Sequence, residues 1–139
     1  MSQKGTHQQG IFRIPGVAST VHKMKDLVDA GEHLSLQNYR ILDIAGLLKL
    51  YFRELPDSLL PSDMFHYIYN FNLNASTDAQ IWDNVYIIQR IMNMIDVELR
   101  VVWKSLILCL VEISANSEEN KMVSSNLATC LAPTVMISK

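Results

Sequence analysis

Apolar residues recur at three- and four-residue intervals along most of this chain, and this spacing constrains the fold more than any other feature of the sequence. The clearest case is the segment 41–55, where Pro56 ends the pattern. Its apolar face consists of Ile41, Ile44, Ala45, Leu48, Phe52 and Leu55. Nowhere do apolar and polar residues alternate over enough positions to predict a β-strand. The sequence therefore predicts an all-α protein.

The same spacing predicts further helices before and after this segment. They cover 18–30 (ended by Gly31), a short stretch from Ser62, 79–95, 98–115, and 117–132 (ended by Pro133). Residues 70–78 are expected to form a loop. The faces expected to be buried include Val21, Met24, Leu27 and Val28 on the helix 18–30, and Ile81, Val85, Ile88, Met92 and Ile95 on the helix 79–95. A chain of 139 residues is long enough for one domain, so we expect one compact helical bundle.

Charge and composition exclude several classes of function. The formal net charge is −2, which gives no field favouring nucleic acid or an anionic membrane. Cys109 and Cys130 lie in apolar helical patterns and are expected to be buried thiols in a reducing compartment. The first ten residues lack the apolar core of a signal peptide, and the longest apolar run is too short to span a bilayer. We therefore expect a cytoplasmic protein.

Arg13 is the first candidate functional residue, in the segment GIFRIPG at positions 10–16. Gly10 and Gly16 permit tight backbone angles, and Pro15 restricts the residue before it to extended conformations. One interpretation is an exposed arginine whose stem covers a neighbouring apolar side chain. The other is a guanidinium on a rigid turn, directed at phosphate oxygens of another molecule.

Lys49 and Arg53 form a second candidate, because residues four apart lie one above the other on a helix. They share an edge with Gly46, which costs roughly 1 kcal/mol relative to alanine in mid-helix. The simpler interpretation is a solvated helix edge, with Arg53 pairing locally. The alternative is a surface on which another backbone lies close.

Asn126 is a third candidate, because asparagine is a poor helix former and lies here in an otherwise apolar helical pattern. It either bridges groups within the fold or presents an amide to a partner. Asn120 is expected to start a helix. No phosphate-binding loop, zinc spacing or nucleophile motif occurs, so we expect no metal site and no cofactor bound by this chain alone.

Three blocks in this order, GIFRIPG, LLKLYFRELPDSLLP and NKMVSSNLATCLAP, resemble the Rho GTPase-activating protein (RhoGAP) domain. The resemblance implies an all-helical activator of GTP hydrolysis by Rho-family small GTPases. Arg13 matches the family's arginine finger, which is a catalytic arginine supplied in trans. Lys49 matches a lysine of the GTPase-facing surface, and Arg53 an arginine that helps fix the finger segment. Asn126 matches an asparagine that meets the GTPase near its switch regions.

The resemblance also sets expectations for the partner and for the ends of the domain. GTP and Mg²⁺ would belong to the partner GTPase, which would also recruit the chain to membranes. An alternative function is an interaction module that binds small GTPases or other proteins without activating hydrolysis. The chain is expected to be one RhoGAP-like domain over residues 1–139, with 1–9 as a flexible lead-in.

Compared with the family, the bundle is expected to lack N- and C-terminal flanking helices, and the apolar surface this leaves predicts a homodimer or a domain swap. Gly46 is expected to lie under the finger segment. Gly46→Leu should then reduce activity more than stability.

Overall fold

The computed structural model describes residues 3–72 and 74–136, and in this part of the chain every regular element is helical. The all-α prediction is therefore confirmed. The α-helices are α1 (Gln3–Thr6), α2 (Ala18–Asp29), α3 (Ile41–Glu54), α4 (Phe65–Ile68), α5 (Asp78–Met94), α6 (Val97–Ala115), α7 (Ser117–Asn120) and α8 (Ser124–Val135). Two short 3₁₀ helices, η1 (Leu36–Asn38) and η2 (Ser62–Met64), lie in the connections.

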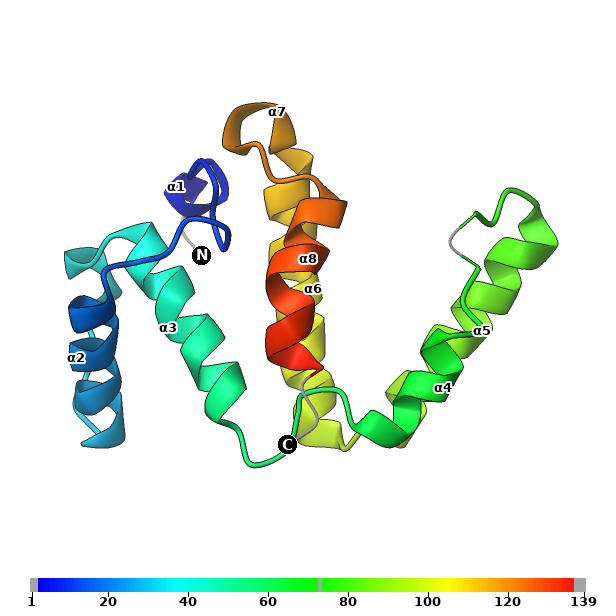
Figure 1. Ribbon diagram of the computed structural model, residues 1–139, viewed down its shortest axis with the longest axis horizontal. Helices are drawn as coiled ribbons and strands as arrows, with labels where there is room; N and C mark the ends of the chain where they lie inside the picture. The colour runs from blue at the N-terminus through cyan, green and yellow to red at the C-terminus, as the bar shows by residue number, and fades with distance from the viewer. Residues whose placement is uncertain (1–2, 73, 137–139) are drawn as a thin grey trace.

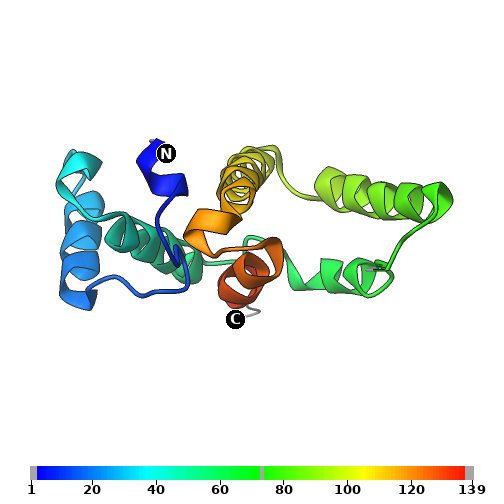
Figure 2. The same cartoon turned by 90° about the horizontal axis from the view of Figure 1, so that it is seen from above.

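Helices α6 and α8 lie side by side at the centre of the molecule (Figure 1). Helix α3 packs against α8 on one side and carries α2 on its outer face. Helices α4 and α5 extend to the opposite side, well away from α2 and α3 in both views (Figure 2). The bundle is therefore densest around α3, α6 and α8, and more open at α4 and α5.

The principal core lies where α3, α6 and α8 meet. Its buried members are Ile11, Phe12, Ala45, Ile113, Met122, Leu127 and Leu131. Full burial of one such aliphatic or aromatic side chain contributes about 1.5–3 kcal/mol. Two of these residues, Ile11 and Phe12, come from the segment that contains Arg13, so this segment is part of the core and not an appended loop.

The predicted helix 117–132 is wrong in its extent, because the chain forms two helices there. Helix α7 ends at Asn120, and Lys121 takes a left-handed conformation with φ of +61°. A left-handed residue interrupts a right-handed helix, and α8 begins only at Ser124. Helix α8 then continues through Pro133 to Val135, although Pro133 was expected to end it. Proline removes one backbone hydrogen bond but does not prevent the last turn from forming.

Most predicted buried positions are correct, but two of those expected on the helix 79–95 are not buried. Ile81 and Ile88 are exposed, and Ile91 is buried instead, together with Ile95. The reason is that α5 is buried mainly at its C-terminal end, where it meets α4 and η2. Val28, near the end of α2, is also exposed where burial was expected.

The other boundaries agree closely with the predictions. Helices α2, α3 and α6 begin and end within one residue of the expected limits. Thr77 caps α5 by accepting a hydrogen bond from the Gln80 N–H, which ends the predicted loop. No helix within the described ranges is both long and apolar enough to cross a membrane.

Candidate functional site

The segment from Gly10 to Val17, here called the Arg13 turn, places Arg13 on the surface. Gly10 and Phe12 both have left-handed backbone conformations, with φ of +67° and +66°. The Arg13 and Ile14 N–H groups both donate to the Gly10 carbonyl, at 2.9 and 2.8 Å. This tight turn buries Ile11 and Phe12 and leaves Arg13 exposed. Both interpretations of the sequence expect an exposed Arg13, and the structure adds that its backbone stands on a constrained turn.

Three hydrogen bonds from distant parts of the chain hold the Arg13 turn. Its first residue, Gly10, donates its N–H to the Asn120 carbonyl at 2.8 Å. Lys49 Nζ donates to the Phe12 carbonyl at 3.0 Å. The last residue, Val17, donates its N–H to Asp43 Oδ1 at 2.8 Å. The turn is therefore fixed at its start, middle and end by α7 and α3.

Lys49 and Arg53 both lie beside the Arg13 turn, but they differ in their contacts. Both line a shallow groove of about 220 Å³, whose wall also includes Phe12 and Gly16. The resemblance gave Arg53 the task of fixing the turn, whereas the direct hydrogen bond to the turn comes from Lys49. Within the described ranges neither Arg53 nor Arg13 forms an ion pair with an acidic side chain. Both guanidinium groups are therefore available to an external anion.

Gly46 lies in the same groove and allows two elements to approach α3. A Cβ atom at this position would lie 3.0 Å from Val21 Cγ2 on α2 and 3.9 Å from the Gly16 nitrogen. The nearest neighbour is therefore α2, and the Arg13 turn is the next. The expectation that Gly46 lies under the turn needs this correction, because a larger side chain would displace α2 first.

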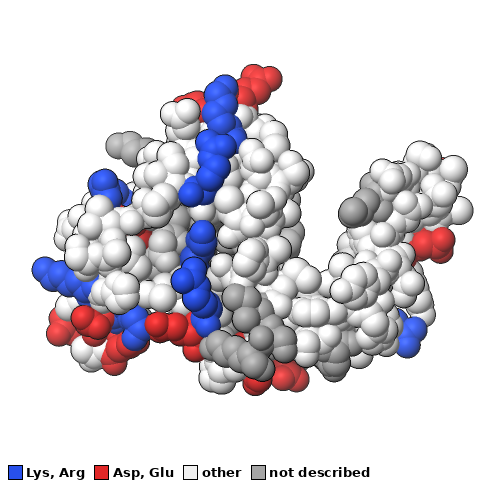
Figure 3. All heavy atoms as spheres, viewed as in Figure 1, with Lys and Arg blue, Asp and Glu red and all other residues white. Residues whose placement is uncertain are grey.

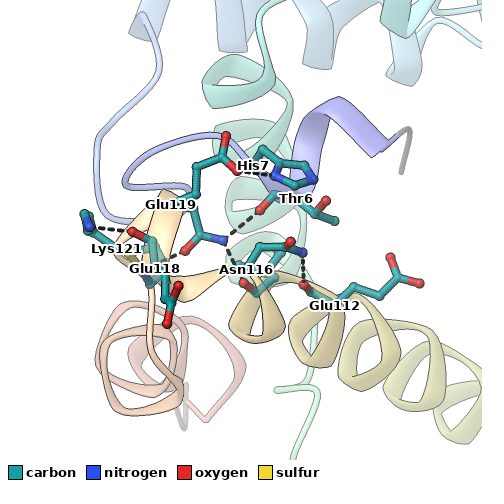
Figure 4. A network of polar contacts seen from close by, with 10 residues as sticks. Thr6, His7, Glu112, Asn116, Glu118, Glu119 and Lys121 are labelled. Carbon is teal, nitrogen blue, oxygen red and sulfur yellow. Dashed lines mark hydrogen bonds and ion pairs between the residues drawn. The ribbon is translucent and has the colours of Figure 1, made fainter.

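Asn120 connects the Arg13 turn to three other segments and is fully buried. In the polar network around it, His7 points toward Glu119 (Figure 4). Its Nδ2 donates to the carbonyls of Thr6 and Ile113, each at 2.7 Å, and its Oδ1 accepts from the Met122 N–H at 2.8 Å. The prediction that Asn120 starts a helix is wrong, since it is the last residue of α7. Its contacts with residues far away in sequence explain why local helix signals did not reveal its position.

Residues 3–9, expected to be a flexible lead-in, include helix α1 and make contacts with this arrangement. Helix α1 brings the Thr6 carbonyl to Asn120, and His7 Nδ1 lies 2.6 Å from Glu119 Oε2. Thr6 is buried. The first two residues of the expected lead-in, Met1 and Ser2, lie outside the described residues.

Asn126, on the first turn of α8, is half-buried and lies close to the same turn of the chain. Its Nδ2 donates to the Lys121 carbonyl at 3.3 Å, a long hydrogen bond. Lys121 directly follows Asn120, whose carbonyl holds Gly10. Residues 120 and 121 therefore connect Asn126 to the Arg13 turn. Two of the site residues predicted from sequence, Arg13 and Asn126, are thus linked through the same two backbone positions.

Asp43 is a site residue that the sequence reasoning missed. The residue is 98% buried, and its carboxylate pairs with Arg40, through Nε to Oδ2 and Nη2 to Oδ1, both at 2.9 Å. The hydrogen bonds from Arg40 hold the pKa of Asp43 below its ordinary value, burial opposes them, and the Val17 N–H adds to the lowering. The spacing of Arg40 and Asp43 is compatible with a helix-start pair, but the contact with Val17 has no local sequence signal.

Lysine and arginine side chains form a stripe down one face, from α7 to the space between α3 and α8 (Figure 3). Three cations lie near the Arg13 turn. Lys121 adjoins Asn120, which holds the Arg13 turn, while Lys49 holds Phe12 and Arg53 follows one turn later on α3. Such a surface can bind anionic oxygens of another molecule. Over the described ranges, no three histidine, cysteine or acidic residues are grouped as metal ligands.

The whole chain, residues 1–139, matches the family model of the RhoGAP domain. Among curated proteins, SLIT-ROBO Rho GTPase-activating protein 3 of Mus musculus is 38% identical over 135 residues, covering 95% of this chain and 12% of the relative. Rho GTPase-activating protein gacY of Dictyostelium discoideum is 30% identical over 140 residues, covering 100% of this chain and 19% of the relative. The chain therefore spans less than a fifth of the length of either relative.

Two solved structures have the same fold. The crystal structure of human Rho GTPase activating protein 15 gives a TM-score of 0.84 at 25% identity, covering 96% of this chain and 63% of that one. The BH domain from GRAF, the GTPase regulator associated with focal adhesion kinase, gives a TM-score of 0.81 at 26% identity, covering 98% and 72%. The likeness extends over nearly all of this chain.

Proposed function

Because this chain belongs to the RhoGAP domain family, we propose that it stimulates GTP hydrolysis by a Rho-family small GTPase, with Arg13 supplied in trans as an arginine finger. The observation that supports this most directly is the exposed guanidinium of Arg13 on a turn held at three points. A turn held in this way loses little backbone freedom when its arginine enters a neighbouring site.

The proposed chemistry is electrostatic stabilisation of phosphoryl transfer. During hydrolysis, charge is redistributed over the γ-phosphate and leaving-group oxygens, and a guanidinium placed against them stabilises the transition state. Arginine fingers of other GTPase systems contribute about 10³–10⁵ in rate. GTP and Mg²⁺ belong to the partner GTPase in this mechanism, so this chain supplies side chains and no cofactor.

The surrounding residues have separate parts in the proposal. Lys49 holds the Arg13 turn through the Phe12 carbonyl and lies at the surface that meets the GTPase. Arg53 lies one helical turn further along α3 and extends the cationic edge toward the partner. Asn126 presents its amide from the first turn of α8, near the switch regions of the GTPase.

Location and assembly are further parts of the proposal. The domain acts in the cytoplasm and reaches membranes through its GTPase partner. Exposed apolar side chains on α5 and α6, among them Trp82, Tyr86, Val97 and Val101, favour self-association as a homodimer or a domain-swapped pair.

The decisive test is single-turnover GTP hydrolysis by a Rho-family GTPase with this chain and with Arg13→Ala. We expect Arg13→Ala to lower the stimulated rate by at least about a hundredfold while binding to the GTP-bound partner stays within a fewfold. Arg13→Lys should restore little, because lysine cannot present the planar fork. Arg90→Ala is the matched control, since Arg90 on α5 lies over the ring of Tyr67 on α4, away from the Arg13 turn.

The two candidate functions predict different results in this assay. A stimulated rate that Arg13→Ala leaves unchanged would refute the finger. Binding to the GTPase without stimulation by the unmodified chain would instead identify an interaction module.

A further inference from the structure

The downstream end of the Arg13 turn is anchored by one buried carboxylate, that of Asp43 in the first turn of α3. Its Oδ1 accepts from the Val17 N–H at 2.8 Å and from Arg40 Nη2 at 2.9 Å, while its Oδ2 accepts from Arg40 Nε at 2.9 Å. Charge-assisted hydrogen bonds of this kind are roughly twice as strong as neutral ones. Asp43 therefore joins Val17 to α3 more firmly than a neutral acceptor would.

Gly16 strengthens this anchor by lying directly against the same residue. A Cβ atom at Gly16 would lie 2.8 Å from Asp43 Cα, from Asp43 Oδ1 and from the Leu42 carbonyl oxygen. Two of these three atoms are backbone, which cannot move aside as the end of a flexible side chain can. The backbone of Gly16 and Val17 thus packs directly against α3 at Asp43.

The other two anchors act only on the upstream half of the turn. The Asn120 carbonyl holds residue 10, and Lys49 holds residue 12. Arg13, Ile14 and Pro15 are exposed and come after both of these contacts. If the downstream anchor were lost, the exposed part of the turn would be held on its downstream side only through α2, which begins at Ala18.

We propose that Asp43 is a positioning residue for Arg13, a role that rests on the proposed function. It fixes where the turn returns to α3, and so limits the positions from which the Arg13 guanidinium approaches the partner's phosphate. It makes no contact with the GTPase in this role. Displacement of a catalytic group by about 1 Å can cost roughly a hundredfold in rate, so a loosened turn has a large effect without any change in charge at the site.

The first test measures the maximal single-turnover rate and the half-saturating concentration of the chain for Asp43→Ala and Asp43→Asn. We expect Asp43→Ala to lower the maximal rate about 10–100-fold, with half-saturation within about threefold. Asp43→Asn keeps an acceptor for Val17 but loses the carboxylate pair with Arg40, so its loss is smaller. Asp29→Ala is the control, because Asp29 forms an exposed ion pair with Lys25 on α2.

The same substitutions in an Arg13→Ala background separate positioning from general weakening of the fold. If Asp43 acts through Arg13, Asp43→Ala produces no further loss once the guanidinium is absent. An equal loss in both backgrounds overturns the proposal. The thermal unfolding midpoint of each variant shows whether it folds. If Asp43→Ala does not fold, the two backgrounds are compared with Asp43→Asn.

Hydrogen exchange gives a readout that does not depend on the proposed function. Asp43→Ala and Asp43→Asn should both speed amide exchange in the segment 10–17, while exchange in α8 stays unchanged. Unchanged exchange in 10–17 overturns the proposal whatever the hydrolysis rates are. Faster exchange, combined with an Arg13→Ala variant of full activity, would show that the anchor exists and that the finger mechanism is wrong.

Discussion

At the scale of single residues, Phe12 shows how the fold stabilises an unfavourable backbone conformation at the Arg13 turn. A left-handed conformation costs a residue other than glycine roughly 1–2 kcal/mol. The ring of Phe12 is 98% buried in the principal core, and burial of such a ring contributes about 1.5–3 kcal/mol. Burial is the larger of the two effects. The side chain that follows, Arg13, is therefore directed outward at little net cost.

Asn120 is expected to matter more for stability than any exposed polar residue of the site. Asn120→Ala would leave the Met122 N–H and the carbonyls of Thr6 and Ile113 without this partner in a buried place. We expect the free energy of unfolding to fall by about 2–4 kcal/mol, measured by urea denaturation. Asn93→Ala, on the exposed surface of α5, should change it by less than about 0.5 kcal/mol. Similar effects of the two variants would contradict the buried network.

Stability should depend on pH through Asp43, whose pKa lies below its ordinary value of 3.8 in the folded protein. The unfolded chain then binds a proton at a higher pH than the folded chain does. The stabilisation from Asp43 is therefore complete above about pH 4 and is lost as pH falls through the lowered pKa.

Urea unfolding of the parent chain and of Asp43→Asn at pH 3–7 measures this contribution. The difference in unfolding free energy should be constant from pH 5 to pH 7 and should shrink below about pH 4. A difference that stays constant down to pH 3 would rule out the lowered pKa.

The residues of the site differ in how far sequence could predict them. Arg13, Lys49 and Arg53 stand in local patterns, and the structure places all three beside one groove or turn. Asp43 holds that turn through a contact across 26 residues, and Asn120 holds it through Gly10, near the other end of the chain. Such contacts depend on how whole elements pack, so neither the helix periodicity nor the capping signals indicated them.

At the scale of elements, helix limits were predicted best where the apolar pattern is long. Helices α2, α3 and α6 agree with their expected ranges, whereas the break between α7 and α8 was missed. At the break, the Asn120 side chain accepts from the Met122 N–H and Lys121 is left-handed. The spacing of apolar residues indicates an apolar helix face, but it does not indicate a short break in the helix.

The packing of α2 on α3 should respond to the size of residue 46. Gly46→Ala gains about 1 kcal/mol in helix propensity, which offsets the small shift needed at Val21, so we expect a net change within about 1 kcal/mol. Gly46→Leu must displace α2 or the Arg13 turn and should cost about 1–3 kcal/mol.

Thermal unfolding and single-turnover hydrolysis together test the effect of residue 46. The leucine variant is expected to lose both stability and activity, since Val21 is its nearest neighbour and Gly16 the next. Loss of activity with unchanged stability would mean that the turn moves and α2 does not.

At the scale of the whole molecule, the open placement of α4 and α5 leaves an extended apolar surface along α5 and α6. A groove of about 760 Å³ lies there, lined by Ile88, Met92, Val97, Arg100, Val101, Trp103, Lys104 and Ile107. Val97 and Val101, one helical turn apart, are both more than 60% exposed. Contiguous apolar surface of this kind favours association between protein molecules.

We therefore expect the chain to associate at high micromolar concentration, measured by light scattering or sedimentation. Val101→Lys should weaken association at least tenfold, because it puts a charge into the apolar groove beside Arg100 and Lys104. Since Val101 is exposed in the single chain, the unfolding free energy should change by less than about 0.5 kcal/mol. Lys23→Glu, an exposed charge change on α2, is the control and should leave association unaltered. A monomeric parent chain would contradict the prediction, and equal association of parent and Val101→Lys would place the contact on another surface.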